Sequence, residues 1–297
     1  MPHSTQERLF RAFLNNFNNL RSTPPKGAPP TKHNHHVPKT FLEGFFEKGE
    51  TAHVLHKTHP EVVLYKPPVS LKRLCAMKDL YSFPASAVGK PDRTSLEHLF
   101  GVLESWWPEF KQRLSASEPS APAIDLRTRT SEEHFKLSLF LAQLVCRSPK
   151  AMSLHPGFRN SQSGEAALAS LELCENIAWD ILELSWILYY SKDGYIIGDA
   201  PFCAPTKTST LFPLSRHWAL EVSRQYESSF QVMQMGPTEA INNQIFAMAR
   251  RYVVVPNTCR LYNPDQDDLI RTVTEPPPNK LFDLRKDCKI TYKGKRL

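Results

Sequence analysis

The chain has 297 residues, of which 41% are hydrophobic and 23% are charged, close to the average of soluble globular proteins. This length suffices for one large domain or two small ones with a sizeable core. Since no stretch approaches the run of about eighteen apolar residues that a membrane-spanning helix needs, we predict no membrane span. The sequence has 25 prolines against 11 glycines, which indicates many stiff connections between short elements.

The net charge of +7 is concentrated at the two ends of the chain. Residues 1–33 contain five basic side chains and one acidic one, and residues 280–297 contain seven and two. The segment between them is therefore slightly acidic. Basic ends of this kind bind a polyanion such as nucleic acid weakly and in a salt-sensitive way. A solvated tail without a partner is the alternative interpretation.

Residues 5–21 place leucine and phenylalanine side chains on one helical face together with three arginines, which predicts an amphipathic helix. A proline-rich stretch, residues 23–31, follows, so we define residues 1–32 as a basic arm before the folded domain. We expect the helix to dock on that domain, and mitochondrial targeting by residues 1–21 is the alternative. The six cysteines are spaced singly without a C-x-x-C motif, which favours reduced thiols and a cytoplasmic protein.

The most informative segment is residues 33–46, which read HNHHVPKTFLEGFF. His35 and His36 precede a Val-Pro dipeptide, which restrains the backbone to an extended or turn conformation. Apolar side chains at helical spacing follow, from Phe41 to Phe45. An anchored backbone with apolar contacts downstream holds a histidine in one place, so this segment predicts a positioned site.

Apolar side chains at three- and four-residue spacing predict helices near residues 94–114, 132–147, 164–190 and 237–250. Short apolar or alternating runs bounded by turn residues predict strands at residues 51–57, 61–66, 195–198, 210–214, 218–222 and 252–255. The fold class is therefore α+β, with a helical centre and short strands on both flanks. We expect residues 33–260 to form a single domain, followed by a basic C-terminal tail over residues 261–297.

The segment from His35 to Phe45 resembles the signature H-x-[VI]-P-x-x-[YF]-L-x-x-F of an uncharacterised bacterial and fungal family, a domain of unknown function. Further motifs are similar to those of this family and occur in the same order: Asp79-Leu80-Tyr81, Glu104 within a helix, Arg147-Ser148-Pro149, Gly198-Asp199-Ala200-Pro201 and, after Asn242, Ala249-Arg250-Arg251-Tyr252-Val253. The resemblance covers roughly residues 33–255 and implies no activity. Gly198 and Ala200 depart from the Ser and Asn common in that turn of the family, which weakens a role for its side-chain hydrogen bonds.

Polar residues at these positions offer the groups of an acid–base site. A histidine supplies a general base near neutral pH, carboxylates supply acids or metal ligands, and a guanidinium binds an anion in a bidentate way. The candidate catalytic residues are His36, Glu104 and Asp199, and the candidate substrate-binding residues are Arg147, Asn242 and His35.

This constellation suits acid–base or metal-assisted hydrolysis of a phosphodiester, with nucleic acid as the substrate class and a divalent metal as one option for a cofactor. The alternative is a non-catalytic interaction module in which a buried network, the Glu104–Arg147 pair in particular, is structural. A single site requires His36, Glu104, Arg147 and Asp199 to open on one concave pocket. We also expect Arg147 to contact at least one of the two carboxylates.

Other signatures carry less information. His53, His56 and His59 fall on a predicted strand and turn, where a spacing of three puts neighbours on opposite faces, so we expect them outside the site. An HNH-type nuclease motif is not supported, because residues 37–62 contain no asparagine. The sequence also has no G-x-S-x-G, no P-loop and no G-x-G-x-x-G.

Overall fold

The structure is a computed structural model of the chain. It describes residues 5–21, 33–46, 53–57, 62–65, 71, 74–78, 80, 95–117, 126, 128, 130–152, 169, 173–206, 208–224, 230–233, 238–249, 252–255, 261–263, 268–270, 282–285 and 288–292. These residues form an α+β fold, which confirms the predicted class.

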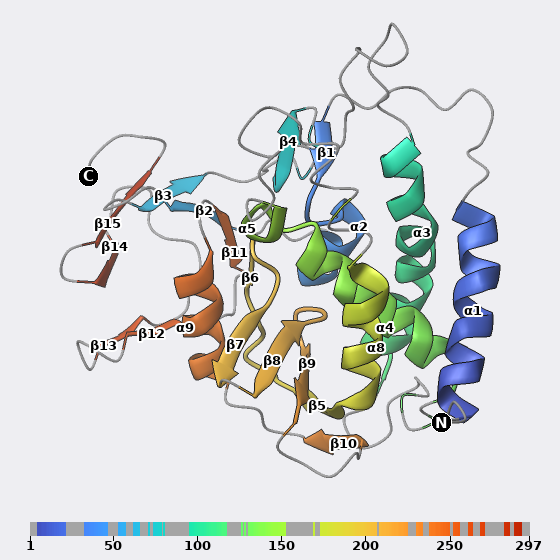
Figure 1. Cartoon of the computed structure of the whole chain (residues 1–297). Coiled ribbons are helices and arrows are strands. Elements are labelled where there is room, and N and C mark those ends of the chain that lie inside the picture. Colours follow the sequence, from blue (N-terminus) through green and yellow to red (C-terminus); the bar gives the residue numbers. More distant parts are fainter. Residues whose placement is uncertain are drawn as a thin grey trace, which may run out of the picture.

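Helices α1, α3, α4 and α8 stand together on one side of the molecule, and α9 lies on the other side among the strands (Figure 1). The helices are α1 (Thr5–Arg21), α2 (Lys39–Leu42) with the 3-10 turn η1 (Glu43–Phe45), α3 (Ser95–Ser115), α4 (Glu132–Cys146), α5 (Pro149–Met152), α8 (Cys174–Glu183) and α9 (Thr238–Met248). The helices predicted near residues 94–114, 132–147 and 237–250 are confirmed as α3, α4 and α9.

A five-stranded sheet has the order β10-β5-β9-β8-β7. Its strands are β5 (Ser185–Tyr190), β7 (Cys203–Thr206), β8 (Ser209–Pro213), β9 (Trp218–Ser223) and β10 (Phe230–Met233). All neighbours pair antiparallel except β10 and β5, which are parallel. The predicted strands at residues 210–214 and 218–222 are confirmed as the hairpin β8–β9.

A six-stranded sheet has the order β14-β15-β3-β2-β11-β6, with β15 parallel to β3 and the other pairs antiparallel. Its strands are β2 (His53–Lys57), β3 (Val62–Tyr65), β6 (Ile197–Gly198), β11 (Tyr252–Val255), β14 (Phe282–Arg285) and β15 (Cys288–Tyr292). Two further pairs are β1 (His33–His35) with β4 (Ala76–Lys78) and β12 (Leu261–Asn263) with β13 (Asp268–Ile270). Strands therefore occur within residues 261–297, which the sequence analysis assigns to a basic tail, and the domain boundary at residue 260 stays a prediction.

The prediction of one long helix over residues 164–190 is wrong at its C-terminal end. Helix α8 ends at Glu183, the backbone of Leu184 is extended, and β5 begins at Ser185. Strand β5 lies between β9 and β10 and is buried along almost its whole length. Its continuous apolar run therefore has the pattern of a buried helix, although aromatic side chains and Ile187 favour a strand.

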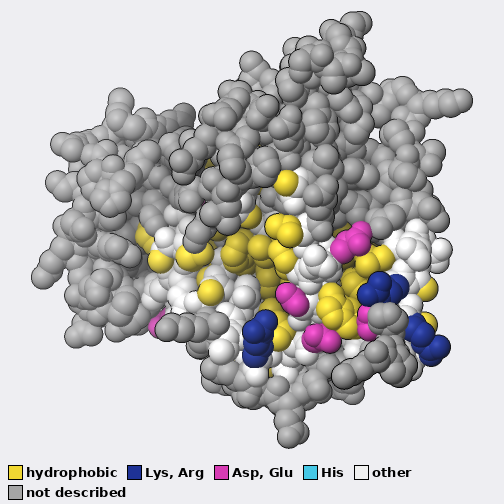
Figure 2. Space-filling view, in the orientation of Figure 1, with side chains coloured by type: hydrophobic (Ala, Val, Ile, Leu, Met, Phe, Trp, Pro, Cys, Tyr) yellow, Lys and Arg dark blue, Asp and Glu magenta, His cyan; other side chains and the backbone are white. Residues whose placement is uncertain are grey.

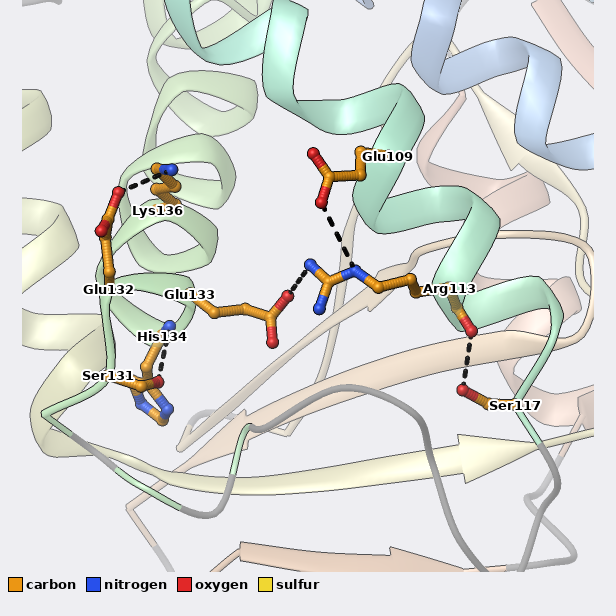
Figure 3. A network of polar contacts seen from close by, with 8 residues as sticks. All are labelled: Glu109, Arg113, Ser117, Ser131, Glu132, Glu133, His134 and Lys136. Atoms are coloured by element: carbon orange, nitrogen blue, oxygen red, sulfur yellow. Dashed lines mark hydrogen bonds and ion pairs between the residues drawn. The ribbon is translucent and has the colours of Figure 1, made fainter.

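Helices α3 and α4 are antiparallel and are joined by an ion pair at each end of α4. At one end Arg147, the C-cap residue of α4, pairs with Glu104 of α3. At the other end Arg113 of α3 pairs with Glu133 in the first turn of α4, and Figure 3 shows these two side chains pointing toward one another between the helices. Midway along, Trp107 stacks on an aromatic ring of α4, with the ring centroids 4.4 Å apart. The helix pair is therefore fixed in register by charge at its ends and by aromatic packing at its centre.

Apolar side chains of the described residues form one core that extends from Phe10 in α1 to Val254 in β11. The helices contact the five-stranded sheet where the ring of His134 stacks on Trp186 of β5, with centroids 3.7 Å apart. The Trp186 Nε1 donates to the carbonyl oxygen of Ile181 at 2.9 Å, which fixes the corner between α8 and β5. In Figure 2, apolar side chains gather in the middle of the described surface, and charged side chains of both signs lie mostly toward the helical side.

Among the helices that the structure describes, none is long and apolar enough to cross a lipid bilayer.

Candidate functional site

The histidine segment is fixed by backbone pairing before it and by a buried helical turn after it. Strand β1 ends at His35 and pairs antiparallel with β4. The carbonyl oxygen of Pro38 accepts hydrogen bonds from the backbone N–H groups of Phe41 and Leu42 at 3.1 and 3.0 Å, which starts α2. Both of these side chains are completely buried. The anchored backbone that the sequence predicts is therefore present.

The guanidinium of Arg147 is enclosed by the protein. One terminal nitrogen, Nη1, donates to the Glu104 carboxylate, and the other, Nη2, donates to the carbonyl oxygen of His35. The Arg147 carbon Cζ lies 4.3 Å from the centre of the Phe100 ring, at a cation–π distance. The Arg147 side chain is 1% exposed and that of Glu104 is 24% exposed. The expected contact between Arg147 and a carboxylate is confirmed, and the same guanidinium also holds the histidine segment.

The imidazole of His35 lies at the partly exposed edge of this network. Its Nε2 lies 3.3 Å from the carbonyl oxygen of Leu71, so in the neutral tautomer that bonds there Nε2 donates and Nδ1 is an acceptor. Burial lowers the pKa of His35 below its ordinary value of 6.5, and the nearby positive charges of Arg147 and Lys39 lower it further. The hydrogen bond to Leu71 and the Glu104 carboxylate raise it in part. The net direction favours the neutral imidazole.

Cys75 is hydrogen-bonded to the backbone of His36 and lies within the electrostatic influence of Asp199. The backbone N–H of His36 donates to the carbonyl oxygen of Cys75 at 2.9 Å, and Cys75 has a left-handed backbone with φ of 52°. Burial raises the pKa of the Cys75 thiol, and the negative charge of Asp199 raises it further. Asp199 is itself buried at the end of β6, where its backbone N–H donates to the carbonyl oxygen of Tyr252 at 3.0 Å.

Asn242 contacts a different part of the chain. Its side-chain oxygen accepts from the backbone N–H of Ile196 at 3.0 Å, and its side-chain nitrogen donates to the carbonyl oxygen of Gly194 at 3.1 Å. One turn earlier on α9, Thr238 donates to the hydroxyl of Ser191 at 2.8 Å. These contacts hold the loop before β6 to α9. The sequence analysis did not single out Thr238 or Ser191, and the only signal for them is the helical spacing of four between Thr238 and Asn242.

The predicted site residues are thus distributed over connected but distinct contacts. The structure brings Glu104, Arg147 and His35 together, bonds the backbone of His36 to Cys75 within the electrostatic influence of Asp199, and uses Asn242 on the loop before β6. His36, Arg147, Asp199 and Asn242 are all buried. Sequence patterns indicate no role for the backbone carbonyl oxygens of His35 and Cys75, which accept hydrogen bonds from Arg147 and from the backbone of His36.

Two cavities occur elsewhere, on either side of α1. One, of about 310 Å³, lies between α1 and α8, and the other, of about 420 Å³, lies between α1, α3 and α4. Neither cavity is lined by a predicted site residue. Within the described part of the chain, no three His, Cys, Asp or Glu side chains are grouped as a metal would need. The side chains of His53, His56 and His59 lie outside the described residues.

Residues 33–173 match the family model described as protein of unknown function (DUF4238). This match confirms the resemblance to a domain-of-unknown-function family over that segment, which contains His36, Glu104 and Arg147. No curated protein and no solved structure matches the chain. Helices α3 and α4 lie inside the DUF4238 segment, whereas α1 precedes it and β5 to β15 follow it.

Proposed function

We propose that the chain is a non-catalytic interaction module whose polar network is structural. The enclosure of the Arg147 guanidinium carries this proposal. A phosphate-binding arginine needs its nitrogens directed at the ligand, but here the terminal nitrogens donate to Glu104 and to the His35 carbonyl, and the flat face covers Phe100. The side chain is almost completely excluded from solvent. These contacts suit a residue that fastens the histidine segment to α3 and α4.

The second ion pair between the same helices supports this interpretation. Arg113 and Glu133 join α3 and α4 at the opposite end, far along both helices from Glu104 and Arg147. The arginine is the C-cap residue of α4 in one pair and lies on α3 in the other. Two ion pairs that both fix the register of α3 against α4 indicate a structural role for these charged residues. A partner then binds at the protein surface and not at the polar network.

The test is the stability of a Glu104→Gln variant. Removing one partner of a buried ion pair typically costs about 3–5 kcal/mol. Since Glu104 is 24% exposed, we expect roughly half of that, a decrease in melting temperature of roughly 4–8 °C. Glu109→Gln is the matched control, because Glu109 is 75% exposed and 3.9 Å from Arg113. A Glu104→Gln variant that melts with the wild type would overturn the structural role.

A second candidate function is hydrolysis of a phosphodiester, with nucleic acid held by the basic ends of the chain. The partial exposure of His35 and Glu104 on either side of Arg147 favours it. Burial lowers the pKa of His35, so the imidazole is neutral near neutral pH and suits a general base, with Glu104 as the acid or as a ligand of a divalent metal. The free thiols of Cys75, Cys146, Cys174 and Cys203 support a cytoplasmic location for such an enzyme.

Cleavage of labelled single- and double-stranded oligonucleotides, with and without magnesium or manganese, tests this candidate. The hydrolase requires that His35→Gln and Glu104→Gln abolish cleavage while both variants melt near the wild type. Glu109→Gln, whose side chain lies at the surface of α3, should cleave normally. The absence of cleavage under every metal condition, together with a large loss of stability in Glu104→Gln, eliminates the hydrolase and retains the interaction module.

A further inference from the structure

Helix α1 packs on aromatic side chains of α4 and α8. Phe10 is buried, and the centroid of its ring lies 5.4 Å from that of Phe135 on α4 and 5.7 Å from that of Trp179 on α8. Phe13, one turn later, lies 5.7 Å from Phe135, and Leu14 is also buried. The surface formed by α4 and α8 therefore accommodates three side chains of one helix: an aromatic residue at position i, a second aromatic residue at i+3 and a leucine at i+4.

The packing of α1 is incomplete on both sides. The cavity of about 310 Å³ separates it from α8 beside Glu175, and the cavity of about 420 Å³ separates it from α3 beside Val102. Leu9, which lines the larger cavity, is 44% exposed. Both cavities are open to solvent, so among the described residues the two flanks of α1 are surface clefts rather than packed interfaces.

Helix α1 also differs from the surface beneath it in charge and in its position in the chain. Helix α8 contains three acidic residues and no basic one, whereas α1 contains three arginines and one glutamate. An α1-like helix is therefore attracted to α8. The helix also lies before the DUF4238 segment, which contains α3 and α4.

We propose that the surface of α4 and α8 beneath α1 is a helix-binding groove, which α1 occupies reversibly. Its partner is a basic amphipathic helix of another protein that presents the same aromatic and leucine side chains and displaces α1. This binding mode lays the apolar face of a helix into a hydrophobic groove. The inference rests on the proposed interaction function and names its surface and partner class. In the free protein α1 competes with the partner, because its attachment to the chain gives it a high effective concentration.

A labelled peptide of residues 5–21 is the probe, and fluorescence anisotropy with the full-length chain is the measurement. In a Phe10→Asp chain the attached helix no longer competes, so we expect the wild-type peptide to bind at least ten-fold more tightly than to the wild-type chain. Ala12→Gln is the control, since Ala12 is exposed on α1 and the substitution changes no charge, and that chain should bind the peptide as the wild type does. A peptide carrying Phe10→Asp should bind neither chain. Equal binding of the wild-type peptide to the folded Phe10→Asp and wild-type chains overturns the proposal.

If the Phe10→Asp chain does not fold, native-state hydrogen exchange of the wild-type chain tests whether α1 detaches reversibly. A reversibly seated α1 exchanges its amides through local opening, at least a hundred-fold faster than the amides of α4. Exchange of α1 only through global unfolding overturns the proposal. Either negative result leaves the proposed function standing if Glu104→Gln is destabilised, so the two failures are distinguishable.

Discussion

Gly198 sets the distance between β6 and α9 through the absence of a side chain. A Cβ atom built there lies 2.9 Å from the Cβ of Ala249 and 3.5 Å from the backbone carbonyl oxygens of Ala200 and Tyr252. The first separation is far below a normal carbon–carbon contact, and a Cβ atom moves only with its backbone. Glycine at position 198 is therefore required by this packing.

We predict that Gly198→Ser lowers stability by about 1–3 kcal/mol, the usual cost of inserting atoms into a packed interior. The urea midpoint of unfolding measures the change. Gly101→Ala in α3 is the matched control, since no heavy atom lies within 4 Å of an added Cβ there. The control should gain up to about 1 kcal/mol from its better helix propensity. Equal midpoints for Gly198→Ser and the wild type would show that β6 and α9 separate at no cost.

The titration of His35 predicts a loss of stability on the acid side of neutrality. Burial lowers the pKa of His35 in the folded chain below the ordinary 6.5, so the unfolded chain binds more protons in that interval. Stability is therefore fully present above about pH 6.5 and is lost as pH falls toward the folded-state pKa. The melting temperature should decrease between about pH 7.5 and pH 5.5, and His35→Gln should reduce that decrease. Identical pH profiles for the two proteins would contradict this assignment.

At the scale of residues, the sequence indicates which charged side chains form ion pairs but not which backbone groups they also contact. Sequence and physics alone predict that Arg147 contacts at least one of the two candidate carboxylates, and the structure shows that this carboxylate is Glu104. The bond from Arg147 to the His35 carbonyl is not predicted, because backbone acceptors leave no trace in residue identity. The left-handed conformation of Cys75 is equally invisible, since a cysteine rarely adopts it.

At the scale of elements, the sequence indicates amphipathic helices better than buried strands. Helices α3 and α9 bury one face, which the spacing of their apolar residues shows. Helix α4 is buried on nearly all sides, and its start is indicated by the serine cap and the acidic first turn. Strand β5 has neighbours on both edges and no polar face, so its spacing carries no period that distinguishes strand from helix. Strand β10 is parallel to β5, and such a pairing joins segments distant in sequence that no local pattern identifies.

The N-terminus of α4 gives an element-scale prediction. The hydroxyl of Ser131 accepts from the backbone N–H of His134 at 3.2 Å, as Figure 3 shows. Ser131→Ala removes this cap and should cost about 1 kcal/mol, or roughly 2–4 °C in melting temperature. Ser105→Ala is the same substitution on the exposed face of α3 and should change the melting temperature by less than about 1 °C. Equal melting of the two variants would show that the cap contributes nothing to stability.

At the scale of the whole molecule, one apolar core connects the helical layer to both sheets. It includes Trp107 of α3, Trp186 of β5 and Val254 of β11. Polar contacts add to this continuity, since Arg147 joins α4 to the histidine segment and Asn242 joins α9 to the loop before β6. A shared core makes separate unfolding of one layer costly, because the other layer would expose its apolar face to water.

This continuity predicts that the described body of the chain unfolds in a single cooperative transition. Far-UV circular dichroism reports mainly on the helices, whereas tryptophan fluorescence reports on all five tryptophans, which include Trp186 in β5 and Trp218 in β9 of the five-stranded sheet. The two signals should change at the same denaturant concentration, and the calorimetric and van't Hoff enthalpies should agree within about 10%. Asn242→Ala, which leaves the buried polar groups of Ile196 and Gly194 without their bonds, should shift both signals equally by about 2–4 kcal/mol. Two separated transitions, or a shift of one signal alone, would show that the helical layer and the sheets are separate domains.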